Sequence, residues 1–124
     1  MKQVLATEQA PAAIGPYSQG IAAGETVYVS GQLPLDPATG AFPEGIAAQT
    51  AQSLKYIQAI LAQQGMTLAN VVKTTVFLAD INDFAEMNKV YGEFFTQPYP
   101  ARSAVQVAKL PKDAPLEIEC IAVK

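Results

Sequence analysis

The fold is decided by two stretches near the C-terminus, RSAVQVA at residues 102–108 and LEIECIAV at residues 116–123. Apolar and polar residues alternate in both stretches, which is the pattern of a strand with one buried face. A turn that contains proline and lysine, residues 109–115, joins the two stretches. We therefore expect them to form two antiparallel neighbouring strands of one sheet.

The alternation also predicts which side chains lie on each face of this sheet. The face that packs against helices should carry one set from the two strands: Ser103, Val105, Val107, Leu116, Ile118 and Cys120. The opposite face should carry the other set: Arg102, Ala104, Gln106, Glu117, Glu119 and Ile121. Arg102 would then emerge beside two carboxylates on a face without a helix. The apolar Ile121 and Val123 on that face favour burial against another subunit.

Two helices are predicted upstream of these strands. Residues 46–64 place apolar side chains at the 3.6-residue period of an amphipathic helix, and Gly65 follows where a left-handed C-cap is expected. A second helix should begin at Asn82 or Asp83, with Glu86 as a capping-box partner. Its buried stripe should consist of Phe84, Met87, Tyr91 and Phe94.

Three further strands complete the pattern. Residues 18–23 and 26–30 should form a hairpin, and residues 71–79 alternate and are rich in Val and Thr. The order ββαβαβ with a closing β predicts an α+β fold, in which two helices pack on one face of a mixed sheet. We expect a single domain over residues 1–124.

The composition narrows the classes of function. Half of the 124 residues are apolar and only 15% are charged, against a usual charged share of about 25%. We interpret this low charge as surface that is buried in an oligomer. The net charge of -3 and the pI of about 4.8 speak against a nucleic-acid partner.

The chain has no His and only one Cys, Cys120. A Ser-His-Asp triad, a Cys-His pair and a His-ligated metal are therefore excluded, and no intrachain disulfide can form. No glycine-rich segment has the Lys of a phosphate-binding loop, so we expect no metal and no phosphate-bearing cofactor. Residues 1–13 lack the apolar core of a signal peptide, and no stretch is apolar for the ~18 residues of a membrane span. We expect a cytoplasmic protein.

Arg102 is the only arginine in the chain. A guanidinium group can hold a carboxylate through two parallel hydrogen bonds, which lysine cannot reproduce. The alternative is an ion pair with Glu117 or Glu119. Each of these glutamates is in turn either a catalytic carboxylate or a solvated strand residue that neutralises Arg102.

Four other residues are candidates for lining a pocket. Tyr17 follows a rigid Gly-Pro turn, Ser30 and Gly31 end a strand, and Asn88 borders the buried stripe of the second helix. Each has a structural alternative, which is core packing for Tyr17, a plain turn for the Ser-Gly pair and backbone hydrogen bonds for Asn88. Cys120 should be a small core residue.

Several motifs resemble those of the RidA (YjgF-like) family of enamine and imine deaminases. They are AIGPYSQG at residues 13–20, SGQLP at 30–34, and PARSAV at 100–105 followed by LEIE at 116–119. The resemblance runs from about residue 4 to the end and implies a chorismate-mutase-like fold in a homotrimer with clefts between subunits. It also implies the hydrolysis of 2-aminoacrylate, 2-iminopropanoate and 2-iminobutanoate to 2-keto acids and ammonia. By the same resemblance, pyridoxal-phosphate-dependent Ser/Thr dehydratases would release these substrates.

The resemblance assigns roles to the candidate residues. Arg102 would bind the substrate carboxylate, and Glu117 would position or activate the attacking water. The residues that would line the cleft are Tyr17, Ser30, Gly31 and Asn88. Two departures bear on substrate preference, because Ala104 stands where the family commonly has Cys and the segment 96–99 is shortened.

Two other functions stay open at this point. The first is a module that binds carboxylate ligands, or acts like a chaperone, without turnover, and it would use the same Arg102. The second is a ribonuclease or translation inhibitor. The single arginine, the absence of His and the acidic pI speak against the second.

Overall fold

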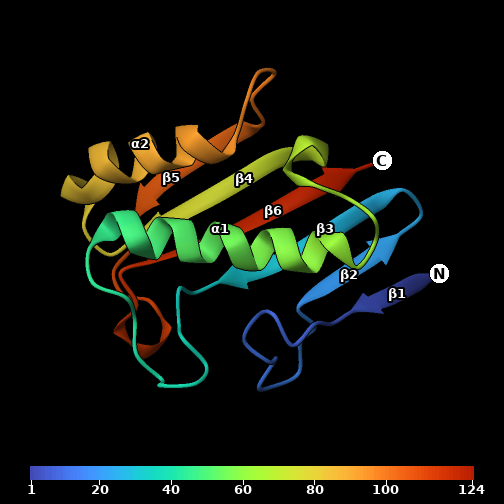
Figure 1. Cartoon of the computed structure of the whole chain (residues 1–124), viewed down its shortest axis with the longest axis horizontal. Coiled ribbons are helices and arrows are strands. Elements are labelled where there is room, and N and C mark those ends of the chain that lie inside the picture. The colour runs from blue at the N-terminus through green and yellow to red at the C-terminus, as the bar shows by residue number, and fades with distance from the viewer.

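The computed structural model describes residues 1–124. Its strands are β1 (Lys2–Leu5), β2 (Gly20–Ala23), β3 (Thr26–Gln32), β4 (Val71–Leu78), β5 (Ala101–Gln106) and β6 (Leu116–Val123). Its helices are α1 (Ile46–Ala62) and α2 (Phe84–Phe94), and short 3-10 turns span Leu68–Asn70, Ile81–Asp83 and Pro111–Asp113. Both helices pack on one face of the sheet (Figure 1). The predicted α+β architecture is confirmed, with β1 as an additional edge strand that the sequence analysis missed.

Neither helix combines the length and apolar character needed to cross a membrane.

The order of strands in the sheet is β1-β2-β3-β6-β4-β5. Only β4 and β5 are parallel, and the other neighbours are antiparallel. The prediction that the strand of Arg102 lies beside the strand of Glu117 is therefore wrong, because β4 lies between them. The reason is the connection through α2, which leaves the end of β4, crosses one face of the sheet and returns as a parallel strand beside β4.

The register of β4 with its two neighbours fixes which face each side chain occupies. Thr74 is the partner of both Arg102 and Cys120, so these residues share the face that the helices cover. Thr75 is the partner of both Ser103 and Glu119, which therefore share the open face. The predicted faces are correct for β6 and wrong for β5, where Val105 is 44% exposed.

The core lies between the helices and the sheet. Leu54, Ile57 and Leu61 of α1 are fully buried, as are Val76 and Ile118 on the central strands. Burial of these branched side chains supplies the main favourable free energy of folding.

The predicted helix ends are partly confirmed. Gly65 after α1 has a φ of 69°, in the left-handed region that favours glycine. The capping box predicted for α2 is wrong, because the Asp83 side chain makes no capping hydrogen bond. Asp80 instead accepts a hydrogen bond from the Asn82 backbone N–H and caps the 3-10 turn that leads into α2. The predicted buried stripe holds for Met87 and Tyr91.

Gly20 sets how closely α1 approaches the sheet. A Cβ atom at this position would lie 2.8 Å from Cγ2 of Ile60 and 3.4 Å from the Tyr28 carbonyl oxygen. The Gly20→Ala variant should therefore lose about 1–3 kcal/mol of unfolding free energy, since an overpacked core must shift backbone or side chains. Urea denaturation measures this loss.

Gly92→Ala is the matched control, because a Cβ at Gly92 in α2 meets nothing within 4 Å. That variant should be unchanged or more stable by up to about 1 kcal/mol. Equal unfolding free energies of wild type and Gly20→Ala would contradict the close approach of Ile60 in α1 to Gly20 in β2.

Candidate active site

Arg102 extends from the edge strand β5 toward helix α2. Its Nη1 donates a hydrogen bond of 2.7 Å to Oδ1 of Asn88. Its guanidinium carbon lies 4.7 Å from the centre of the Tyr91 ring and 5.4 Å from that of Phe84. The alternative role of Asn88, hydrogen bonding to backbone, is wrong in this structure, because its side-chain oxygen binds Arg102.

No carboxylate neutralises Arg102 within the chain. The one ion pair in the structure joins Lys109 Nζ and Asp113 Oδ1 at 3.2 Å, and both of its side chains are exposed. Glu117 and Glu119 cannot reach Arg102 because they leave the opposite face of the sheet. The predicted ion pair does not form inside one chain, so the guanidinium is available to an outside anion.

Arg102 lines a pocket between the edge strand β5 and helix α2. The residues that line this pocket are Asn88, Tyr91, Gly92, Tyr99, Pro100 and Arg102. Tyr99 belongs to the short segment before β5, and its side chain is 58% exposed. We name this group the arginine half-site. Aromatic rings, an amide and a free guanidinium suit a small ligand that carries a carboxylate.

Glu117 lies on the other face of the sheet, in a pocket of about 420 Å³. Among the residues that line it are Ile14, Tyr17, Ser30, Gly31, Lys112 and Glu117. We name this group the glutamate half-site. Three of the predicted cleft residues thus gather around Glu117.

Gly31 makes room for the Glu117 side chain. A Cβ atom at Gly31 would lie 2.5 Å from Cδ and 2.7 Å from Oε2 of Glu117. Burial raises the pKa of Glu117, and the nearby charge of Glu119 raises it further. A half-buried carboxylate with a raised pKa is a better proton acceptor than a solvated one.

Gln19 is a buried residue that the sequence analysis did not single out. Its side-chain oxygen accepts a hydrogen bond of 2.7 Å from the Thr7 N–H, and its amide nitrogen donates to the carbonyls of Thr7, Ala10 and Pro11. These bonds fix the N-terminal loop that leads to Tyr17. A Gln between a Gly-Pro turn and the start of β2 was the available signal, but the sequence does not tell a buried amide from an exposed one.

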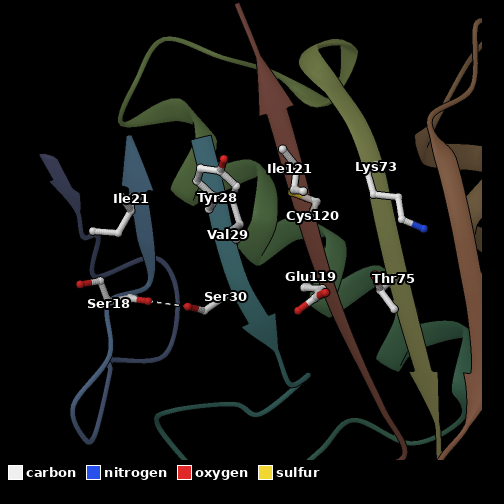
Figure 2. A pocket seen from close by; sticks show the side chains of 10 residues that line it. All are labelled: Ser18, Ile21, Tyr28, Val29, Ser30, Lys73, Thr75, Glu119, Cys120 and Ile121. Carbon is white, nitrogen blue, oxygen red and sulfur yellow. Dashed lines mark hydrogen bonds between the residues drawn. The ribbon is translucent and has the colours of Figure 1, made fainter. Parts of the chain in front are cut away.

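A second hollow on the open face shares Ser30 with the glutamate half-site, and Figure 2 shows the residues that line it. Ile121 of β6 lies there between Tyr28 of β3 and Lys73 of β4, and Glu119 lies beside Thr75 of β4 (Figure 2). Tyr28 is 51% exposed, and Lys73 Nζ donates to Ser103 Oγ at 3.0 Å. Glu119 therefore faces a different hollow from Glu117, in which Ser30 is the one shared predicted residue.

Cys120 is a core residue, as predicted. It is 3% exposed on the helix-covered face, and burial raises the pKa of its thiol to about 12. Cys120 therefore cannot supply a reactive thiol in place of the cysteine that the family commonly has at the position of Ala104.

The sequence model of the family described as Endoribonuclease L-PSP matches residues 7–124. A 2-iminobutanoate/2-iminopropanoate deaminase of Salmonella typhimurium is 53% identical over 100% of this chain and 99% of its own length. The crystal structure of RidA from the Antarctic bacterium Psychrobacter covers 98% of this chain and 99% of its own, with a TM-score of 0.93 and 48% identity. That of TdcF from E. coli with bound serine covers 98% of both chains, with a TM-score of 0.93 and 47% identity.

The sequence match and the fold shared with these structures thus define an α+β protein of the L-PSP type. The chain belongs to this family, which is the RidA (YjgF-like) family that its motifs indicated.

The contact between Gly31 and Glu117 gives a direct structural prediction. In a Gly31→Ala variant, the Glu117 carboxyl group should move by about 1 Å to regain an ordinary contact distance. The end of a glutamate side chain moves at little cost, so the unfolding free energy should change by less than about 1 kcal/mol. A crystal structure and a denaturation curve of the variant measure both effects. A carboxyl group that stays in place while β3 shifts would contradict the prediction.

The pKa of Glu117 should depend on Glu119. Replacement of the second carboxylate in Glu119→Gln should lower the pKa of Glu117, because one of the two causes that raise it is removed. A raised carboxyl pKa means that ionisation of Glu117 costs stability as the pH rises through that pKa, so Glu119→Gln should also reduce this loss. Carboxyl ¹³C NMR across a pH titration measures the shift. An unchanged or higher Glu117 pKa would contradict the coupling.

Proposed function

We propose that this chain is a hydrolytic deaminase that converts 2-imino acids, and the enamines in equilibrium with them, to 2-keto acids and ammonia. One observation carries the proposal: the only arginine is held in place by Asn88 and two aromatic rings without a carboxylate partner. Relatives that cover the whole chain at 53% and 51% identity are 2-iminobutanoate/2-iminopropanoate deaminases. The substrates would include 2-aminoacrylate, 2-iminopropanoate and 2-iminobutanoate.

The reaction requires one group that binds the substrate carboxylate and one that accepts a proton from water. Arg102 would hold the substrate carboxylate through two hydrogen bonds and so orient the imine carbon. Glu117 would accept a proton from a water molecule as its oxygen bonds to that carbon. Glu117 would return this proton to the nitrogen, which gives a tetrahedral intermediate with one hydroxyl and one amino group. The hydroxyl proton would then pass to the nitrogen as the C–N bond breaks, so that ammonia leaves and the oxygen from water becomes the keto oxygen.

We propose that the active site forms between subunits of a homotrimer. Within one chain, the arginine half-site and the glutamate half-site lie on opposite faces of the sheet, so a second copy has to bring them together. The open face carries the exposed Tyr28 and the half-buried Ile121, and only 15% of the chain is charged. The protein would act in the cytoplasm beside the pyridoxal-phosphate-dependent dehydratases that release its substrates.

The two alternative functions make different predictions. A carboxylate-binding module would bind 2-ketobutyrate without accelerating imine hydrolysis. A ribonuclease would be consistent with the family description, but the chain has a net charge of -3, no His and one arginine. RNA binding should therefore be absent at any salt concentration, since the eight Lys and Arg side chains that could contact phosphates are outnumbered by eleven Asp and Glu.

The Arg102→Lys variant tests the carboxylate contact. We expect at least a tenfold loss of imine hydrolysis in an assay that generates the enamine in situ with a Ser/Thr dehydratase. Lysine keeps the charge but loses the paired hydrogen bonds, and a hydrogen bond to a charged group contributes about 1.5–3 kcal/mol. Unchanged turnover with correct folding would show that Arg102 is structural.

Glu117→Gln tests the proton acceptor, with Glu119→Gln as the matched control. Turnover of Glu117→Gln should fall by about 10²–10⁴-fold while 2-ketobutyrate affinity is kept, because the amide preserves shape but accepts no proton. Glu119→Gln should keep most of its turnover. An inactive Glu119→Gln and an active Glu117→Gln would exchange the two roles, and two active variants would leave orientation by Arg102 as the whole mechanism.

A further inference from the structure

One side of α2 is built around Arg102. Phe84, Asn88 and Tyr91 are spaced at i, i+4 and i+7, so they lie on the same side of the helix. All three contact the guanidinium group, the two rings at 5.4 and 4.7 Å and the amide oxygen at 2.7 Å. The position of Arg102 therefore depends on α2 as well as on its own strand.

Tyr91 is itself held in place by two contacts. Its side-chain oxygen makes a buried hydrogen bond of 2.7 Å with Thr74 Oγ1, and its ring lies 4.5 Å from that of Phe95. Thr74 is the register partner of Arg102 on the neighbouring strand. The Tyr91 ring is thus hydrogen-bonded to the part of the sheet from which Arg102 extends.

The arrangement leaves one edge of the guanidinium group unoccupied. The group has five N–H donors, and the chain uses one of them, in the bond to Asn88. The faces of a guanidinium group interact favourably with aromatic rings, whereas its edge donates hydrogen bonds to carboxylates. Contacts of this kind reduce the conformational freedom that the side chain loses when a ligand binds.

We propose that Phe84 and Tyr91 are positioning residues that hold the Arg102 guanidinium through cation–π contacts, with Thr74 fixing the Tyr91 ring, and that this aromatic support sets the affinity for the substrate carboxylate. The inference rests on the proposed function, because it takes Arg102 as the carboxylate site. It assigns a role to three residues outside the set of cleft residues that the motifs indicate.

Binding of 2-ketobutyrate by isothermal titration calorimetry tests this role separately from turnover. Phe84→Leu should bind about two- to fivefold more weakly than wild type, the range expected for loss of one cation–π contact. Phe94→Leu is the matched control, because Phe94 is also a partly buried aromatic residue of α2 but makes no cation–π contact with Arg102. Its affinity should match that of wild type.

Variants of Tyr91 separate the ring from its hydroxyl group. The double variant Tyr91→Phe/Thr74→Val keeps the ring but removes the hydrogen bond that fixes it, so it should bind 2-ketobutyrate more weakly than wild type and more tightly than Tyr91→Leu. Wild-type affinity of the double variant would remove Thr74 from this role. Tyr91→Leu should bind 2-ketobutyrate more weakly than Phe84→Leu, because the Tyr91 ring lies closer to the guanidinium carbon than the Phe84 ring does. If Tyr91→Leu fails to fold, Phe84→Leu against Phe94→Leu still decides the question.

The single arginine allows a spectroscopic readout of the same contact. Arg102 gives the only arginine Nε–H signal in an NMR spectrum, and ring currents from the two aromatic residues should shift it. Phe84→Leu should move this signal and Phe94→Leu should not.

Equal 2-ketobutyrate affinity in wild type and Phe84→Leu would overturn the aromatic support. So would a wild-type protein that does not bind 2-ketobutyrate. Wild-type binding that Phe84→Leu weakens, without any acceleration of imine hydrolysis, would uphold the support and refute the deaminase instead.

Discussion

The position of β4 between β5 and β6 is the constraint on which the site depends. Strand β4 pairs in parallel with β5 and antiparallel with β6, so its register determines which face of the sheet each side chain of β5 and β6 occupies. Thr74 aligns with Arg102 on the side of the helices, while Phe77 aligns with Glu117 on the open side. The guanidinium and the carboxylate that would share one substrate are therefore kept apart within each chain, and the proposed site needs a second copy of the chain to bring them together.

Each half-site is prepared by its own neighbours. On the helix side, Asn88 and two rings of α2 hold Arg102 with its remaining donors free. On the open side, the missing side chain of Gly31 leaves the space that Glu117 occupies, and burial there raises the carboxyl pKa. An imine carbon is already electrophilic, so orientation by one group and proton transfer by another are sufficient for hydrolysis.

The sequence predicts the helices and the strands around the core well, because Ile57, Leu61 and Ile118 follow strong local periods. It fails where local pattern carries no information on pairing. The segment RSAVQVA contains small residues on both faces, so its alternation could not show that Arg102 and not Val105 faces the helices. The candidate residues could be found from their chemistry and from motifs, whereas their separation into two groups follows from a crossover connection that no local pattern encodes.

Mixing of two inactive variants tests most directly whether the active site is shared between subunits. Chains with Arg102→Ala and chains with Glu117→Gln, each carrying a different affinity tag, would be produced together and the doubly tagged oligomers isolated. If each site takes its arginine from one subunit and its glutamate from the next around a closed trimer, every doubly tagged trimer contains one intact site, which is about a third of its sites. The account predicts deaminase activity near that fraction in the mixed oligomers, although neither variant is active alone. Mixed oligomers as inactive as the two parent variants would contradict it.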